Sequence, residues 1–286
     1  MNKVKFVNFW NNNQGYLRFP YWFNEWGVKV EEVDDPDYLF YSVFGLDHLH
    51  YQCKKIFFTW ENYPHYRHID FDGYDFSISH YQIDDERHYW MPSWGWKLMT
   101  MPALKEALLK DVSLLSANDM LNKKNKKCCF VVSNKGCLER NAFFEKLSKR
   151  MVVESAGGYA NNVGYNAPRK LYDYLDWMKK YKFIIAFENS STPGYSTEKI
   201  LFPLCANVIP IYWGDALLDS TLNPDCYINC HRFNTLEDAM EEVLRLDRDD
   251  EAYQAMLAAP KFIDNTLPKE FDSQVFADWL KDIVFT

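Results

Sequence analysis

Short apolar segments suited to β-strands alternate with segments of helical spacing along most of this chain, and this alternation constrains the fold most. Continuous apolar runs at residues 128–132 and 183–187 are typical of buried parallel strands. Helical segments at 138–149 and 198–205 follow them. Because parallel strands need crossover connections, usually helices, the alternation predicts an α/β protein built on doubly wound parallel sheets.

The chain has 286 residues, enough for one large domain or for two of about 100–150 residues. The first part holds four strand candidates and two helix candidates, at residues 3–10, 37–44, 55–60, 74–79, 101–109 and 111–121. The lysine-rich stretch 122–127 is polar and is typical of a surface linker. We therefore predict a first domain over 1–124 and a second over 125–267. A terminal helix within about 268–286 is expected to pack back on the first.

Further helices are predicted at 171–180 and 235–246, and a further strand at 208–212. Thr235 can cap the helix at 235–246, with Asp238 three residues later in the arrangement of a capping box. Ligands in doubly wound sheets bind beyond the carboxyl ends of the strands. We therefore expect the binding and catalytic residues to lie directly after the strands.

Composition excludes several classes of protein. Hydrophobic residues make up 48% and charged residues 25%, which is enough apolar content for a packed core and argues against disorder. No uninterrupted apolar run reaches the length of about 18 residues needed for a transmembrane helix. The first ten residues predict a strand rather than a signal peptide, because no apolar core or small-residue cleavage site follows. A net charge of −8 argues against a nucleic-acid partner.

Seven cysteines in a chain without an export signal predict reduced thiols and a cytoplasmic location. Aromatic residues make up 17% of the chain, and flat rings suit both cores and carbohydrate-binding clefts. Most tryptophans are expected in the core. The aromatic candidates for a carbohydrate site are Tyr21, Trp22, Trp90, Trp94 and Trp96.

The most informative segment is 183–214, FIIAFENSSTPGYSTEKILFPLCANVIPIYWG. A buried strand ends in the polar run 188–190, a Pro-Gly turn follows, and Ser196 or Thr197 can cap a helix beginning Glu198-Lys199. Free N–H groups and the positive end of the helix dipole make such a helix N-terminus an anion site. The dipole disfavours the Lys199 cation, and a bound phosphate would compensate for it. We favour this interpretation over a solvated surface lysine.

This segment resembles the donor-binding signature of the α1,3/4-fucosyltransferases, glycosyltransferase family 10, in which FEN, GYxTEK and VPxYWG elements follow one another. The stretch 133–148, SNKGCLERNAFFEKLS, resembles the SN…RxxFF segment of that family. Gly157-Gly158, followed by NNVG at 161–164, resembles its GG…N…G loop. The resemblance spans about 128–214 and becomes weaker in the first domain.

The resemblance implies a GT-B fold, with two Rossmann-like domains facing a cleft. An N-terminal acceptor domain and a C-terminal nucleotide-sugar domain would work without a cofactor or a metal. The implied reaction of this bacterial-type family is inverting transfer of L-fucose from GDP-fucose to a hydroxyl of an N-acetylglucosamine-containing glycan. The acceptor would be of N-acetyllactosamine type or lacto-N-biose type, and the product a Lewis-type glycan. The choice between α1,3 and α1,4 linkage stays open, as does peripheral attachment to the inner membrane.

The resemblance also assigns donor-site residues. Arg140 and Lys199 would contact the pyrophosphate of GDP-fucose, and Glu198 would bind the ribose hydroxyls. Three further residues would lie around the fucose and the diphosphate: Glu188, Asn189 and Tyr195. Negative charge grows on the β-phosphate as GDP leaves, and two fixed cations with a helix N-terminus can stabilise it without a metal. Taken alone, Arg140 is equally well interpreted as a helix-surface charge.

An inverting transfer needs a base to take the proton of the acceptor hydroxyl. The strand candidate KIFFTW at 55–60 runs into Glu61 and resembles the family strand whose final glutamate is the proposed base. The competing carboxylates are Asp84, Asp85 and Glu86. We interpret those three as a solvated charge run and favour Glu61.

Two alternatives stay open: a GT-B transferase for another nucleotide sugar or acceptor, and a non-catalytic module that binds a glycan or a nucleotide. The presence of Glu61, Arg140 and Lys199 argues against the second. One histidine and aspartate cluster fits no known pattern of metal-ligand spacing and is not expected to bind a metal. Its members are His65, His68, Asp70, Asp72 and His80.

Overall fold

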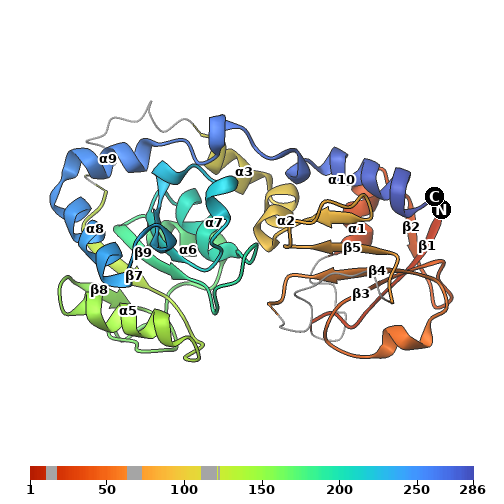
Figure 1. Cartoon of the computed structure of the whole chain (residues 1–286), viewed down its shortest axis with the longest axis horizontal. Helices are drawn as coiled ribbons and strands as arrows, with labels where there is room; N and C mark the ends of the chain where they lie inside the picture. Colours follow the sequence, from red (N-terminus) through yellow and green to blue (C-terminus); the bar gives the residue numbers. More distant parts are fainter. Residues whose placement is uncertain (11–17, 63–72, 111–120, 122) are drawn as a thin grey trace. The chain divides into compact units, whose positions relative to one another are not determined.

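The computed structural model describes residues 1–10, 18–62, 73–110, 121 and 123–286. They form two compact units, Met1–Met101 with Pro268–Thr286, and Pro102–Leu267 (Figure 1). The sequence placed the division at 124/125. The structure instead assigns helix α3 (Pro102–Leu109) to the second unit, where it contacts α7 (Glu198–Cys205). The helix predicted at 111–121 lies outside the described residues except at its last position.

The first unit contains a six-stranded sheet of order β2-β1-β3-β4-β5-β6, and all its pairings are parallel. Its strands are β1 (Asn2–Val7), β2 (Val30–Glu32), β3 (Tyr38–Tyr41), β4 (Lys54–Thr59), β5 (Phe76–Ser79) and β6 (His88–Trp90). The four strands predicted here are confirmed, with slightly different ends. Strands β2 and β6 escaped prediction because three residues are too few to show an apolar periodicity.

Residues 268–286 belong to the core of the first unit. Its helices are α1 (Phe19–Glu25), α2 (Ser93–Thr100) and α10 (Ser273–Trp279), and a π-helical turn, Leu280–Val284, follows α10. Phe276 of α10 is fully buried and contacts Phe23 and Trp96. Trp94 and Trp96 are buried, so these two aromatic candidates are core residues. The C-terminal segment therefore completes a core that the first hundred residues begin.

The second unit contains a five-stranded parallel sheet of order β11-β10-β9-β7-β8. Its strands are β7 (Lys126–Phe130), β8 (Val153–Ser155), β9 (Tyr181–Phe187), β10 (Ile209–Trp213) and β11 (Ile228–Asn229). Besides α3 and α7, its helices are α5 (Leu138–Ser148), α6 (Leu171–Met178), α8 (Leu236–Arg248) and α9 (Asp250–Ala258). The strands and helices predicted in this unit are confirmed, and Thr235 and Asp238 form the expected capping box.

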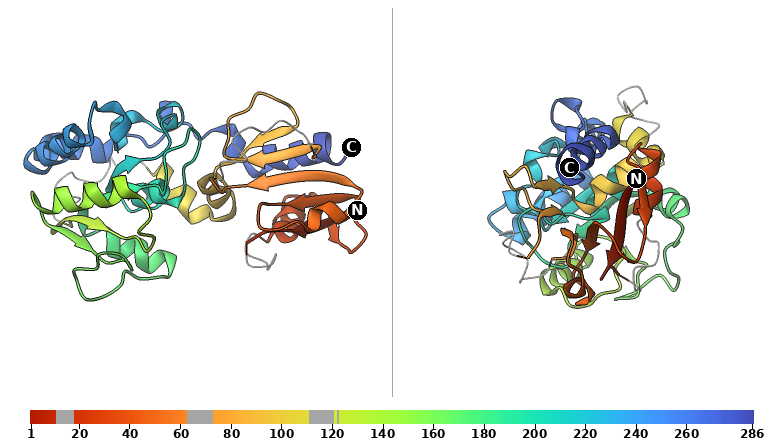
Figure 2. Two further views of the ribbon diagram at one scale, coloured as in Figure 1. Left: turned by 60° about the horizontal axis from the view of Figure 1, so that its bottom comes forward. Right: turned by 90° about the vertical axis from the view of Figure 1, so that its right-hand side faces the viewer.

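Successive side chains of the central strand β9 lie on opposite faces of this sheet, because side chains alternate along a β-strand. Phe183, Ile185 and Phe187 belong to a core cluster with residues of α5, α8 and α9. Ile184 and Ala186 line a pocket together with residues of α6 and α7. The helices thus cover both faces of the sheet, as Figures 1 and 2 show for this unit.

The last two residues of the stretch predicted as a surface linker, 122–127, belong to a strand. Lys126 and Lys127 begin β7, where Lys126 pairs in register with Tyr181. Their side chains are ion-paired, with Nζ–O distances of 2.6 Å to Glu154 and 2.8 Å to Asp247. Lys124 Nζ donates to the Asn207 carbonyl at 2.5 Å, and burial lowers the pKa of Lys124 to about 7. The sequence prediction failed because the lysine content outweighed the strand signal.

No described helix is both long and apolar enough to span a bilayer. All seven cysteines are free thiols, and all except Cys53 are buried. The location of the protein stays a prediction.

Candidate functional site

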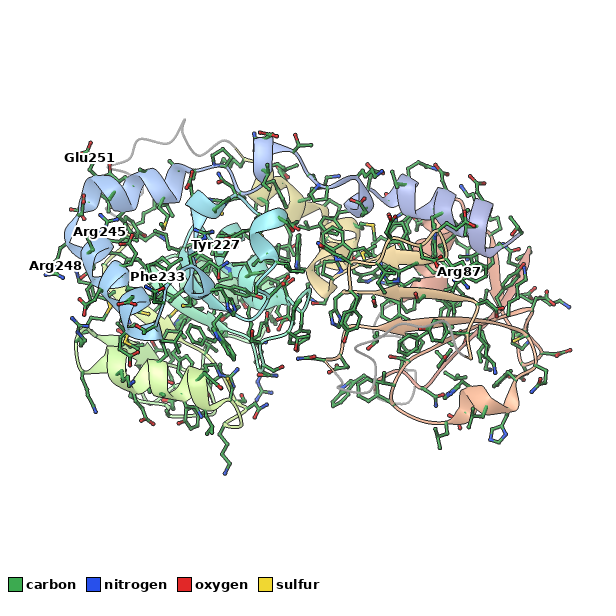
Figure 3. All side chains as sticks on the ribbon, viewed as in Figure 1. Arg87, Tyr227, Phe233, Arg245, Arg248 and Glu251 are labelled. Carbon is green, nitrogen blue, oxygen red and sulfur yellow. The ribbon has the colours of Figure 1, made fainter. Side chains whose placement is uncertain are left out.

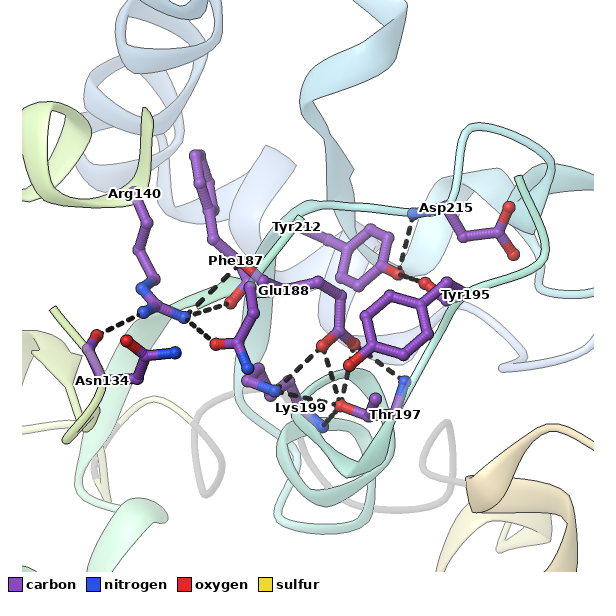
Figure 4. A network of polar contacts seen from close by, with 10 residues as sticks. Asn134, Arg140, Phe187, Glu188, Tyr195, Thr197, Lys199, Tyr212 and Asp215 are labelled. Carbon is purple, nitrogen blue, oxygen red and sulfur yellow. Dashed lines mark hydrogen bonds and ion pairs between the residues drawn. The ribbon is translucent and has the colours of Figure 1, made fainter. Parts of the chain in front are cut away.

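Glu188, the first residue after β9, has zero solvent exposure and joins the end of this strand to the start of α7. Its Oε1 accepts the Thr197 N–H at 2.8 Å, and both carboxylate oxygens lie 2.9 Å from Thr197 Oγ1 (Figure 4). Its Oε2 is 2.9 Å from Lys199 Nζ. Burial raises the pKa of Glu188, and the Lys199 cation opposes that shift. Glu188 is therefore an internal anchor for the N-terminus of α7.

Lys199 lies in the first turn of α7, and its side chain is 24% exposed, so the ion pair reaches solvent on one side. Burial alone would lower the pKa of Lys199. The carboxylates of Glu188 and Glu198 outweigh that effect, and the pKa is raised. The counter-ion of this unusual first-turn cation is thus a protein carboxylate, which the sequence analysis did not foresee. The result is a charged ammonium held at a helix N-terminus.

A pocket of about 410 Å³ lies against β9 and the first turns of α7. Glu198 and Lys199 line it together with a set of apolar residues and loop residues that follow β7 and β8. The apolar part of the wall includes Tyr174, Phe202 and Pro203. The volume and the mixture of apolar surface with a few charged groups are typical of a small-molecule site.

Gly157 and Gly214 permit close approaches beside this pocket. A Cβ atom on Gly157 would lie 2.2 Å from the Val132 carbonyl oxygen, so a side chain there would push apart the loops after β7 and β8. A Cβ atom on Gly214 would lie 2.5 Å from Cγ of Glu188. Glycine at 214 therefore leaves the space that the Glu188 side chain occupies.

Arg140 of α5 also has zero exposure, so the interpretation as a helix-surface charge is wrong. Its Nη1 donates to Asn189 Oδ1 at 2.8 Å, and its Nη2 donates to the Asn134 carbonyl at 2.5 Å (Figure 4). Its Nε has no partner among the described residues. Burial lowers the pKa of Arg140. Arg140 is not among the residues that line the pocket, and its contact with a pyrophosphate stays a prediction.

Tyr195 and Asn189 lie on the loop that connects β9 to α7. Tyr195 is 7% exposed, and its N–H donates to the Thr192 carbonyl at 3.0 Å. This closes a turn in which Gly194, after Pro193, has φ +83°, the arrangement of a type II turn. Asn189 is an exposed residue whose Oδ1 reaches back to Arg140. The loop therefore has a defined conformation and carries both predicted residues.

Glu61 and the competing carboxylates lie at opposite edges of the sheet in the first unit. Glu61 follows β4, so it lies at the edge formed by the carboxyl ends of the parallel strands. Residues 84–86 precede β6 and lie at the other edge. Asp85 is 2.8 Å from Arg87, whose hydrogen bonds lower the pKa of Asp85. Arg87 is labelled in Figure 3. Only Glu61 therefore lies where ligands of parallel sheets bind.

Of the histidine and aspartate cluster that is not expected to bind a metal, the structure describes His80. His80 is buried, and burial lowers the pKa of His80 to about 4. The other members of that cluster, His65, His68, Asp70 and Asp72, lie outside the described residues. Within the part of the chain that the structure describes, no group of three His, Cys, Asp or Glu side chains is placed to hold a metal ion.

Sequence reasoning missed two residues that support this site, Asn134 and Asp215. Asn134 holds Arg140 through its carbonyl, and Asp215 binds the Pro-Gly turn. Both lie within a few residues of the end of a predicted strand, and this position could have marked them as candidate site residues. Gly194 and Asp215 are 21 residues apart, which is too distant for a local motif to reveal their contact. Asn134 and Arg140 both belong to the segment 133–148, but that pattern does not show the hydrogen bond between them.

Comparisons with known proteins identify relatives of both units. The family model described as glycosyltransferase family 10 (fucosyltransferase), C-terminal part, matches residues 121–266. The model described as the alpha-(1,3)-fucosyltransferase FucT N-terminal domain matches residues 4–96.

Two curated relatives illustrate the similarity. The alpha-(1,3)-fucosyltransferase FucT of Helicobacter pylori is 29% identical over 235 residues, which cover 73% of this chain and 48% of that protein. An alpha-(1,4)-fucosyltransferase of Arabidopsis thaliana is 30% identical over 42% of this chain and 34% of its own length. This chain therefore spans less than half the length of these two relatives.

A crystal structure of an alpha1,3-fucosyltransferase superposes with a TM-score of 0.82 and 22% identity, covering all of this chain and 90% of the other. The structure of such an enzyme with GDP-fucose gives 0.78 at the same identity and the same coverage. These similarities establish the GT-B fold.

The buried ion pair leads to a test of stability. Lys199→Met would leave the Glu188 carboxylate buried without a counter-ion, so we expect a loss of about 3–5 kcal/mol in the free energy of unfolding. Urea denaturation measures it. The double variant Glu188→Gln/Lys199→Met removes both charges and should recover most of the loss. The control Lys179→Met breaks an exposed pair with Asp176 and should cost less than about 1 kcal/mol. A double variant less stable than Lys199→Met would contradict the coupling.

Proposed function

Because this chain belongs to glycosyltransferase family 10, the fucosyltransferases, we propose that it transfers L-fucose from GDP-fucose to a hydroxyl of an N-acetylglucosamine-containing glycan. The observation that carries this proposal is the pocket at the start of α7, with a fixed ammonium and a carboxylate on its wall. A diphosphate suits the ammonium and the helix N-terminus, and ribose hydroxyls suit the carboxylate.

The donor roles follow from these positions. Lys199 binds the pyrophosphate, and Glu198, which lines the same pocket, binds the ribose hydroxyls. Asn189 and Tyr195, on the loop before α7, lie beside the fucose and the diphosphate. Glu188 was expected to lie there too. Its zero exposure and its bonds to Thr197 and Lys199 favour a role through Lys199.

Arg140 acts as the second cation in this proposal. Among the described residues, its hydrogen-bond acceptors are carbonyl and amide oxygens, and no carboxylate pairs with it directly. The fixed cations and the N–H groups of α7 stabilise the charge that grows on the departing β-phosphate. This arrangement supplies what a metal ion supplies in other transferases, and we propose a metal-independent reaction.

The transfer step is a displacement at the anomeric carbon of fucose. The acceptor oxygen forms a bond to that carbon while the bond to the GDP oxygen breaks, and the configuration inverts. Glu61 takes the proton of the acceptor hydroxyl as general base. We propose an N-acetyllactosamine-type or lacto-N-biose-type acceptor and a Lewis-type product with an α1,3 or α1,4 linkage.

Incubation of the full chain with GDP-fucose and each disaccharide acceptor tests the function. We expect release of GDP and a fucosylated disaccharide, with equal rates in the presence and absence of EDTA. Mass spectrometry and linkage analysis identify the product. Binding of GDP-fucose without transfer would indicate a non-catalytic module, and transfer from another nucleotide sugar would replace the proposed donor. Loss of activity in EDTA that Mn²⁺ restores would contradict the metal-independent reaction.

The two cations are tested by the affinity for GDP. Arg140→Ala should weaken GDP binding roughly tenfold to a hundredfold, because one charge-assisted contact contributes about 1.5–3 kcal/mol. For Lys199 the comparison is Glu188→Gln/Lys199→Met against Glu188→Gln, which avoids an uncompensated buried carboxylate, and the same loss is expected. Calorimetry provides the affinities. Unchanged GDP affinity in both tests would remove the assignment of the cations.

The proposed base is tested by separating donor affinity from transfer rate. Glu61→Gln should keep the affinity for GDP-fucose and lower the transfer rate by about 10²–10⁴, since the amide cannot accept the proton. The controls Asp84→Asn, Asp85→Asn and Glu86→Gln lie at the opposite edge of the sheet and should change the rate little. Full activity of Glu61→Gln, with loss in one of the controls, would show that the base is misassigned.

A further inference from the structure

Asp215, two residues beyond β10, is 5% exposed and binds the turn at 192–195 in the loop between β9 and α7. Its Oδ1 accepts the Gly194 N–H at 2.7 Å and the Leu217 N–H at 2.9 Å. Its own N–H donates to the Tyr212 hydroxyl at 3.1 Å, and that hydroxyl donates to the Tyr195 carbonyl at 3.4 Å (Figure 4). Asp215 thus reaches the turn directly at Gly194 and through Tyr212 at Tyr195.

These bonds act on the centre of the loop, which belongs to neither a strand nor a helix. Ser191 Oγ of the same loop also donates to the Gly214 carbonyl, which follows β10, at 2.7 Å. Two residues after Tyr195 comes the α7 cap, Thr197, and then Lys199. A displacement of the turn would therefore move Tyr195 and disturb the start of the helix.

We propose that Asp215 is a positioning residue for donor binding, which fixes the Pro-Gly turn so that Tyr195 and the N-terminus of α7 stay in place before GDP-fucose arrives. This inference rests on the proposed function and deepens it. Asp215 is not among the residues that line the pocket, so it acts through the loop and not by contact with the donor. The feature it requires is a hydrogen-bond acceptor at position 215 rather than a negative charge.

Kinetics of three variants test the inference. Asp215→Ala removes the acceptor of two N–H groups and should lower kcat/KM for GDP-fucose about tenfold, chiefly through KM, because the loop is no longer held in its binding conformation. Asp215→Asn keeps an oxygen that can accept both N–H groups and should stay within about twofold of the wild type. Asp225→Ala, an exposed aspartate of the same unit, is the control and should leave kcat/KM unchanged.

Hydrogen exchange gives a second readout that does not depend on activity. The N–H groups of 194–199 should exchange faster in Asp215→Ala than in the wild type, and at the wild-type rate in Asp215→Asn. Circular dichroism at the assay temperature shows that each variant is folded.

Two results would overturn the inference. One is wild-type kcat/KM and exchange in Asp215→Ala, and the other is equal damage in Asp215→Asn and Asp215→Ala, which would show that the charge matters and the acceptor geometry does not. A wild-type chain without fucose transfer would contradict the proposed function instead. Exchange in the loop would then still decide whether Asp215 holds it.

Discussion

The candidate site depends on one buried carboxylate. Removing a carboxylate from water costs several kcal/mol, and the charged form persists only when hydrogen bonds and a cation offset that cost. Glu188 receives both, from Thr197 and from Lys199. These contacts also fix the first turn of α7 against the end of β9, because the carboxylate belongs to one element and its partners to the other. The ion pair that compensates the buried Glu188 carboxylate therefore also sets the orientation of the Lys199 side chain.

The parallel sheet explains why so many contacts meet at this point. Carboxyl ends of parallel strands share one edge, so the loops after β7, β9 and β10 bring residues together that are far apart in sequence. Asn134, Asn189 and Asp215 come from three such loops, and each holds a neighbour through a hydrogen bond. Small residues are required where backbone and side chain meet closely, as Gly214 shows against Glu188. The arrangement of side chains at this edge therefore depends on several strands and their loops, and not on one local segment.

Local signals predicted more of the structure than long-range contacts did. Helix α7 runs from Glu198 to Cys205, as the sequence indicates, and Thr197, one of the two cap candidates, is its cap. Capping and periodicity are predictable because they are properties of adjacent residues. The pairing of Glu188 with Lys199 and the burial of Arg140 could not be predicted, since each depends on how separate elements approach. The division at 101/102 depends likewise on α3 meeting α7, about a hundred residues away.

An ion pair inside a binding site raises the question of whether Lys199 still attracts an anion. Its side chain is 24% exposed while Glu188 has no exposure, so the ammonium keeps one side toward solvent and one toward the Glu188 carboxylate. An ammonium has three donors, and the anchor and the Thr197 hydroxyl use two of them. Among the residues that the structure describes, no hydrogen bond uses the third donor, which would suit a phosphate oxygen. A group held in this way needs little reorganisation when charge develops on the leaving group, and fixed dipoles and charges are most effective under that condition. Glu188 therefore offsets part of the electrostatic field of Lys199 but fixes the position of its ammonium group. A fixed position allows a cation to stabilise a transition state more than the ground state.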